Sequence, residues 1–282
     1  LHLDQGEIAA SSGQVVAASG SSFTVLDTRP KPSRGEIDVT ATGRLDAVLE
    51  VLNNRPLRLM ERAGRPVEIA EDDIQGRAKI TLPLKDGIEA DEVTYAVAAT
   101  LRDVTSAVLV PDRVLEAREL QLTASPDAVA VAGAAELDGV PLTANWTQPL
   151  GDAAATGGEI TGRVALSAAT VDAFDLPLPD GFLSGEGQAD YTLRLPRDPD
   201  APPALALSSD LAGLGLRMDA LGWRKPAAER GALNLRARLG AVPEIDELRL
   251  QTDDLTFDGD LELFENGTLA RARLQALQLS NW

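Results

Sequence analysis

The sequence contains few residues of the types that perform catalysis or bind metal ions. Its single histidine, His2, lies beside the first residue, where an imidazole is far more often solvated than catalytic. Without another histidine, the serine hydroxyls lack the base that would activate them as nucleophiles. The absence of cysteine excludes disulfide bonds and thiolate metal sites. We therefore expect no catalytic residue, no metal site and no cofactor, and we interpret the chain as not being an enzyme.

Two groups of carboxylates have the chemistry to bind a cation. One is Glu71-Asp72-Asp73, and the other runs from Asp253 to Asp260. Neither matches the ligand spacing of an EF-hand, so we interpret both as solvated loop or strand-edge residues. The glycine pairs in Gly185-Glu186-Gly187 and Gly213-Leu214-Gly215 lack the third glycine and the strand–helix context of a phosphate-binding loop.

The charge balance limits the possible partners. The chain of 282 residues carries 26 basic and 44 acidic side chains, for a net charge of −18. Nucleic acids and anionic membrane surfaces attract positive patches, so this charge argues against both. The sequence contains no run of about 18 apolar residues, which is the length that a helix needs to cross a bilayer. Because Leu1 is not a start methionine and residues 274–282 still have a strand pattern, we interpret the chain as an internal segment of a longer protein.

The elements that would position a functional surface begin at Gly35. Residues 36–42 have the composition of a strand, and residues 45–63 are predicted as a helix that Pro56 interrupts. The apolar residues of this helix follow the helical period: Leu45, Val48, Leu49 and Leu52.

This opening recurs later in the chain. Gly35-Glu36-Ile37 is matched by Gly158-Glu159-Ile160, which lies 159 − 36 = 123 positions further on and precedes a shorter predicted helix over residues 168–175. A duplication of units of roughly 120 residues explains the recurrence, with coincidence as the alternative. It predicts a first repeat over 1–150 and a second over 151–282.

Most of the remaining sequence alternates between apolar and polar residues, as half-buried strands do. Residues 93–101 are the clearest example, with Val93, Tyr95 and Val97 on one face. One good helix and one short helix are too few to cover so many strands. The sequence therefore predicts a mainly β fold: an elongated, curved antiparallel sheet whose apolar side forms a groove. A β-sandwich of two sheets that cover each other is the alternative.

Three segments resemble the repeats of AsmA-like proteins of the YhdP and TamB type. They are residues 45–60, the string Leu221-Gly222-Trp223-Arg224-Lys225-Pro226 and the hairpin Leu137-Asp138-Gly139-Val140-Pro141-Leu142. The resemblance extends over nearly the whole chain, but its motifs are degenerate.

The resemblance implies a function that composition does not. Proteins of this family are long, are anchored in the inner membrane of Gram-negative bacteria and extend a hydrophobic β groove through the periplasm. It implies that this chain is a periplasmic segment that conducts phospholipids between the inner and outer membranes, in contact with phospholipid acyl chains and neighbouring repeats. The residues nominated as lining the groove are Val93, Tyr95, Val97, Leu101, Leu120, Leu122, Leu248, Leu250, Leu261 and Leu263.

Two other functions remain open on the sequence. The chain could be a structural or assembly β module of an outer-membrane biogenesis protein, with a closed core and no lipid guest. A β-solenoid carbohydrate lyase is disfavoured, because no catalytic base or metal set is present and the short period of a solenoid is missing.

Overall fold

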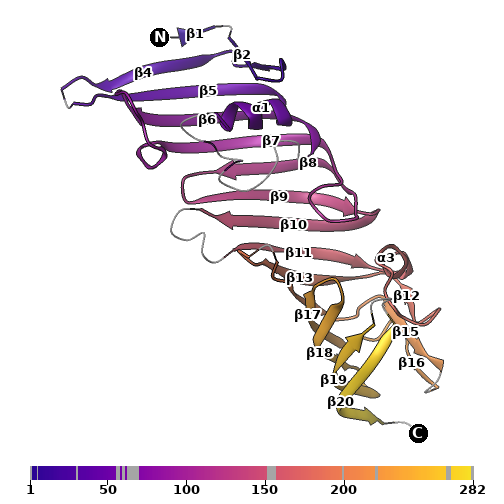
Figure 1. Ribbon diagram of the computed structural model, residues 1–282. Helices are drawn as coiled ribbons and strands as arrows, with labels where there is room; N and C mark the ends of the chain where they lie inside the picture. The colour runs from indigo at the N-terminus through magenta and orange to yellow at the C-terminus, as the bar shows by residue number, and fades with distance from the viewer. Residues whose placement is uncertain are drawn as a thin grey trace. The chain divides into compact units, whose positions relative to one another are not determined.

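We describe the protein from a computed structural model. The described residues are all of 1–282 except 1, 5, 30, 55–57, 59–60, 62–69, 151–156, 199, 220–221, 265–267 and 281–282. The chain divides into two compact units. Unit 1 comprises Leu1–Asp138 and Thr147–Ala153, and unit 2 comprises Gly139–Trp146 and Ala154–Trp282. Both consist mainly of antiparallel strands (Figure 1), which confirms the predicted fold class.

Unit 1 contains one layer of antiparallel strands. The strands β4 to β9 pair in chain order, β3 and β4 share the free edge of β5, and β2 pairs with β3. Their bounds are β1 His2–Leu3, β2 Glu7–Ala9, β3 Val15–Ala17, β4 Ser21–Asp27, β5 Arg34–Arg44, β6 Glu71–Pro83, β7 Thr94–Ser106, β8 Leu115–Ala124 and β9 Ala128–Leu137. The helix α1 is Leu45–Leu52, and a 3₁₀ turn, η1, is Ala90–Glu92.

Unit 2 contains a larger sheet and a smaller one. The larger sheet pairs β11, β13, β14, β17, β18, β19 and β20 in that order, and β12, β15 and β16 form a three-stranded sheet. Their bounds are β11 Gly158–Leu166, β12 Leu183–Gly185, β13 Gly187–Leu195, β14 Ala204–Ser209, β15 Leu214–Met218, β16 Trp223–Lys225, β17 Ala232–Leu239, β18 Pro243–Gln251, β19 Leu255–Leu263 and β20 Leu269–Leu279. Strand β10, Val140–Pro149, contributes residues to both units, and the helix α3 is Ala168–Ala173.

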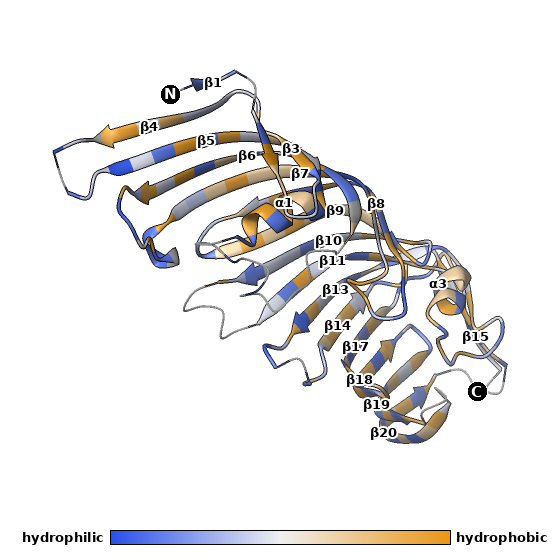
Figure 2. Ribbon diagram, turned by 45° about the horizontal axis from the view of Figure 1, so that its top comes forward, coloured by the Kyte–Doolittle hydropathy of each residue, from blue (hydrophilic) through white to orange (hydrophobic). Residues whose placement is uncertain are grey.

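Alternating burial along the strands confirms the predicted faces. Along β7, Val97 and Ala99 turn inward, while Ala96 and Ala98 are exposed. The alternation shifts by one residue at Asp103, whose φ of 53° marks an irregular position in the strand. Figure 2 shows the resulting alternation of hydrophobic and hydrophilic residues along the strands of each unit.

Both predicted helices are shorter than expected in the described residues. Helix α1 ends at Leu52 with Asn53 as its C-cap, whereas the predicted helix extended to residue 63. Pro56 and most of that extension lie outside the described residues. Helix α3 ends at Ala173 rather than at 175, because Asp175 has a φ of 50°, which does not continue a right-handed helix.

The two units share a local order of elements. In unit 1, β5 leads into α1 and then into β6, which pairs with β5 over the full length of that strand. In unit 2, β11 leads into α3, and β13 later pairs with the full length of β11. The two Gly-Glu-Ile triplets lie in β5 and β11. The duplication over 1–150 and 151–282 stays a prediction.

Candidate functional site: the apolar faces of the two units

The strand register of unit 1 collects its apolar side chains on one face. Four rows of cross-strand neighbours define this apolar face of unit 1: Phe23–Ile37–Ile80–Tyr95, Val39–Ala78–Val97–Ala124, Ala41–Gly76–Ala99–Leu122 and Gly43–Ile74–Leu101–Leu120. The opposite face carries rows such as Thr42–Gln75–Thr100–Gln121. Because side chains alternate along every strand, one register places all these aliphatic groups together.

Five of the six nominated residues of unit 1 lie in these rows, and the sixth, Val93, lies just before β7. Val93, Leu101 and Leu120 are buried, and Leu101 lies directly opposite Leu120. Tyr95, Val97 and Leu122 are half-buried, and so are their neighbours Ile37, Val39, Ala78 and Ile80. All described strands of unit 1 belong to a single sheet, so no second sheet covers this face within the described residues.

One end of the apolar face is covered by a helical cap, which we define as α1 together with the β2–β3 hairpin (Figure 1). Ala47 of the helix packs against Ala10 and Val16 of the hairpin, and Ala41 of the sheet packs against this cluster. The backbone N–H and the hydroxyl of Ser12 donate hydrogen bonds to the Glu50 carboxylate, at 2.9 and 2.6 Å. The polar contacts therefore join the two parts of the cap, and small apolar side chains pack the cap against β5.

Asp72 is a buried acid at the capped end of unit 1. Its side chain lies in β6 and is 6% exposed, and neither carboxyl oxygen has a hydrogen-bond partner among the described residues. Burial, and then the charge of Asp73, raise the pKa of Asp72 to about 6. The expectation that residues 71–73 are solvated is therefore wrong for Asp72, since the alternation of β6 turns it inward while Asp73 is exposed.

Unit 2 also has an apolar face. Its rows include Ile160–Leu193–Leu205–Ala237–Ile245–Leu261 and Gly162–Tyr191–Leu207–Leu235–Leu248–Gly259. The nominated Leu248, Leu261 and Leu263 lie half-buried in this sheet. The nominated Leu250 instead belongs to a closed core beneath the three-stranded sheet.

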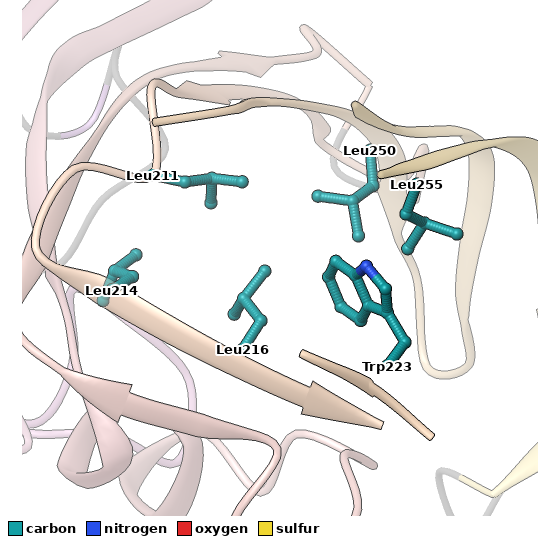
Figure 3. Close-up of a cluster of buried hydrophobic side chains, with 6 residues drawn as sticks. All are labelled: Leu211, Leu214, Leu216, Trp223, Leu250 and Leu255. Carbon is teal, nitrogen blue, oxygen red and sulfur yellow. The ribbon is translucent and has the colours of Figure 1, made fainter. Parts of the chain in front are cut away.

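The three-stranded sheet covers one end of the apolar face of unit 2. Figure 3 shows Leu211, Leu214, Leu216 and Trp223 facing Leu250 and Leu255 of the larger sheet. All six side chains are buried. The contact is a local two-layer packing, so the sandwich arrangement occurs in this part of unit 2 and in no other described part of the chain.

A buried lysine fastens this sheet. The ammonium of Lys225, 2% exposed, donates hydrogen bonds to the carbonyl oxygens of Leu211, Leu214 and Pro226 at 2.9, 2.8 and 3.2 Å. Burial lowers the pKa of Lys225, because it disfavours the charged form. Sequence reasoning did not identify Lys225 as buried. The only signal was its alternation with Trp223 in the short strand β16.

The opposite face of unit 2 is polar and ion-paired. Residues directly opposite each other on neighbouring strands form ion pairs: Arg194–Glu159, Arg163–Asp190, Arg236–Glu247, Arg249–Asp258 and Arg273–Asp260. Two carboxylates of the 253–260 group, Asp258 and Asp260, are used in these pairs. A shallow depression of about 360 Å³ on this face is bordered by polar groups such as Asp190, Asn234 and Arg236, which makes it unsuited to an acyl chain.

The described part of the chain offers few groups for catalysis or for metal binding. The imidazole of His2 lies 3.6 Å from the carboxylate of Asp4, and both side chains are largely exposed. The described residues contain no cluster of three or more potential metal-binding side chains. Among them there is also no helix whose length and apolar character would let it cross a membrane.

Comparison with known proteins gives no relative. No family model, no curated protein and no solved structure matches the chain.

Proposed function

We propose that this chain is a segment of an AsmA-like conduit, anchored in the inner membrane, that carries phospholipids across the periplasm between the inner and outer membranes. The observation that carries the proposal is the apolar face of unit 1. Apolar side chains from five consecutive strands, β4 to β8, line up in register on that face, and the rows that begin at Phe23 and Val39 are half-buried. A row of this kind fits the tail of a lipid, because burial of each methylene stabilises the complex by about 0.8 kcal/mol.

The edge strand β20 supports contact with neighbouring repeats of the same long protein. It pairs with β19 and has no second partner among the described strands. Leu269, Leu274 and Leu277 along it are about half exposed, at 54%, 53% and 47%. A strand of this length with one unpaired edge and exposed leucines is a template for another strand. In the proposal, a further repeat continues the sheet there.

The lipid guest is tested by two neighbouring residues of β7. Val97 lies on the apolar face and Ala98 on the opposite face. Since the chain has no cysteine, Val97→Cys and Ala98→Cys each give a single attachment point for an environment-sensitive fluorophore. Adding phospholipid should shift the emission of the probe at 97 to the blue and leave the probe at 98 unchanged.

The same preparation is extracted gently and its lipids are identified by mass spectrometry. Copurified phospholipid, together with a response at position 97 alone, is the expected result. If no phospholipid is found and neither probe responds, the conduit proposal fails.

A structural or assembly module without a guest is the second candidate function. The closed core beneath the three-stranded sheet favours it, because Leu250 and Trp223 leave no space for a ligand at that end of unit 2. It predicts that neither labelled variant responds to lipid while both stay folded.

A further inference from the structure

Strand β20 forms an exposed edge of the larger sheet of unit 2. It pairs with β19 along one side, and no described strand pairs with its other side. Figure 2 shows β20 beside β19 at the end of the row of strands. Leu269, Leu274 and Leu277 along it are about half exposed. The backbone groups that point to the free side are therefore open to a further strand.

The register with β19 divides the side chains of β20 between two faces. Leu274 and Leu277 lie on the apolar face with their β19 partners, whereas Arg271 and Arg273 lie directly opposite acids of β19 on the polar face. Residues that face each other across two strands project from the same side of a sheet. A strand added at the free side must therefore place apolar side chains beside the leucines and polar ones beside the arginines.

The polar face ends on positive charge at this edge. β20 contains two arginines and no acidic residue. Arg273 pairs with Asp260 and Glu262, and Arg271 pairs with Glu262. The side chains of Arg271 and Arg273 are nevertheless 61% and 56% exposed, so each guanidinium keeps donors for a further acid. In a chain of net charge −18, this edge is a local site of attraction for carboxylates.

Other arginines of the same sheet each bind two acids. Arg238 of β17 pairs with two acids of β18, and Arg249 of β18 pairs with one acid of its own strand and one of β19. Opposite charges that face each other across two strands stabilise a sheet, and like charges destabilise it. Two copies of β20 centred on Ala272 would place Arg271 opposite Arg273. An acidic strand is therefore favoured at this edge, and a second copy of β20 is disfavoured.

The irregular register of β20 does not prevent a second partner. Ala270 and Gln275 have no direct partner in β19, because the register shifts beside each of them. Bulges of this kind can make an edge unsuitable for further pairing. In β18, however, Asp246 has no direct partner in β17 or in β19, and β18 still pairs with both strands.

We infer that the free side of β20 binds an antiparallel strand with carboxylates opposite Arg271 and Arg273 and aliphatic side chains beside Leu274 and Leu277. The pairings of the larger sheet of unit 2 are antiparallel, which sets the expected direction. The inference rests on the proposed function, in which a neighbouring repeat continues the sheet here, and it names the chemistry of the strand that this repeat supplies.

The test uses peptides with the sequence of β19, Leu255–Leu263, because this strand already matches β20 in register. The native peptide is acidic, and the D258K/D260K/E262K peptide is its basic counterpart. We expect the whole 282-residue chain to bind the acidic peptide about tenfold more tightly than the basic one. Nonspecific attraction to a chain of net charge −18 would give the opposite preference.

Hydrogen exchange locates the bound peptide. Along an edge strand, every second residue directs its N–H to the free side. These amides of β20 should gain protection when the acidic peptide is added. Two further peptides are N-methylated, each at one of the two alternating sets of amides. The peptide that is methylated toward β20 should lose binding, and the one that is methylated on its outer side should keep it.

Removal of the arginines then tests the charge. R271Q/R273Q should abolish the preference for the acidic peptide. The control R236Q/R238Q removes two exposed arginines with the same spacing from β17, a strand with partners on both sides, and should keep the preference. Thermal unfolding checks that each variant is folded, and the single variants R271Q and R273Q replace the double variant if it is not. Added salt should weaken the preference of the native chain.

The outcomes separate this inference from the proposed function. If the native chain binds both peptides equally, if R271Q/R273Q keeps the preference, or if the free-side amides gain no protection, the acidic strand is wrong. The lipid response of the probe at position 97 still decides the conduit in that case. If that probe does not respond while the acidic peptide protects β20, the conduit fails and the strand-binding edge stands.

Discussion

Unit 1 and unit 2 cover one end of their apolar faces with different materials. Unit 1 uses a helix and a short hairpin, whose contacts involve small side chains such as Ala10, Val16 and Ala47. Unit 2 uses a three-stranded sheet that brings Trp223 and three leucines onto the larger sheet. In unit 1 the helix follows β5 and the hairpin precedes it, whereas in unit 2 strand β12 follows α3 and strands β15 and β16 lie between β14 and β17.

The two units therefore share a sheet of antiparallel strands and differ in the elements that cover one end of its apolar face. Small residues in the cap of unit 1 bury little area, and the carboxyl group of Asp72 is buried there without a hydrogen-bond partner among the described residues. Unit 2 buries the Lys225 ammonium with three carbonyl partners, and it buries the indole Nε1 of Trp223 without a hydrogen-bond partner among the described residues. The core of unit 2 should be the more stable of the two, because its larger apolar side chains bury more area.

The largest expected effect is on the cover of unit 2. Trp223→Ala removes a buried indole from the core and should lower the free energy of unfolding by about 3–5 kcal/mol. Leu176→Ala, at an exposed leucine of the same unit, is the control and should change stability little. Hydrogen exchange of β15 and β18, measured with denaturant unfolding, checks both. If the two variants were equally stable, Trp223 would not contribute to the core of unit 2, and the proposed difference in stability between the units would lose its basis.

The buried acid of unit 1 should give the next largest effect, in the opposite direction. Because the folded pKa of Asp72 is raised to about 6 from its ordinary value of 3.8, the folded state favours the protonated form. Its contribution to stability is fully present below pH 3.8 and is lost as the pH rises through about 6. At 1.36 kcal/mol per pKa unit, the loss above pH 6 reaches about 3 kcal/mol.

Asp72→Asn should therefore stabilise the protein at pH 7.5 by up to about 3 kcal/mol and have little effect near pH 3.5. The neighbouring exposed Asp73→Asn is the control and should give a much smaller gain. Thermal unfolding of the three proteins across this pH range measures the difference. A gain for Asp72→Asn that did not change with pH would contradict a titrating buried carboxyl.

A smaller loss is expected in the helical cap. Val16→Ala removes two buried carbons next to Ala47 and should cost about 1.6 kcal/mol, at about 0.8 kcal/mol for each carbon. Val15→Ala, one residue earlier and 49% exposed, supplies the matched control. Denaturant unfolding compares the two variants. A cost for Val16→Ala as large as that for Trp223→Ala would show that the cap is as firmly packed as the cover of unit 2.

The sequence predicted the faces of the strands better than it predicted what covers them. Alternation assigns Val97 and Leu122 to one face because side chains alternate with a period of two in every strand. Leu214 and Leu216 show the same period of two, but they belong to β15, which lies in the separate three-stranded sheet. Periodicity says which residues share a face, but the partner of a strand is decided by contacts between distant residues. The closed core around Leu250 therefore could not be foreseen.

The buried charges escaped prediction for a related reason. Asp72 stands among acidic neighbours and Lys225 follows an arginine, so both have the composition of solvated segments. Their burial depends on the phase of a strand and on what lies above it.

The smallest expected effect concerns the polar faces. In unit 2, Arg163 of β11 lies opposite Asp190 of β13, with their charged atoms 2.9 Å apart, whereas the polar face of β7 in unit 1 carries Ala96 and Ala98. Both members of the ion pair are about two-thirds exposed, at 64% and 70%. A double-mutant cycle with Arg163→Ala and Asp190→Ala should give a coupling of about 0.2–1 kcal/mol that weakens as salt is added. A coupling of several kcal/mol that salt did not weaken would mean that these ion pairs stabilise unit 2 as much as its leucine core does, because only desolvated pairs resist screening.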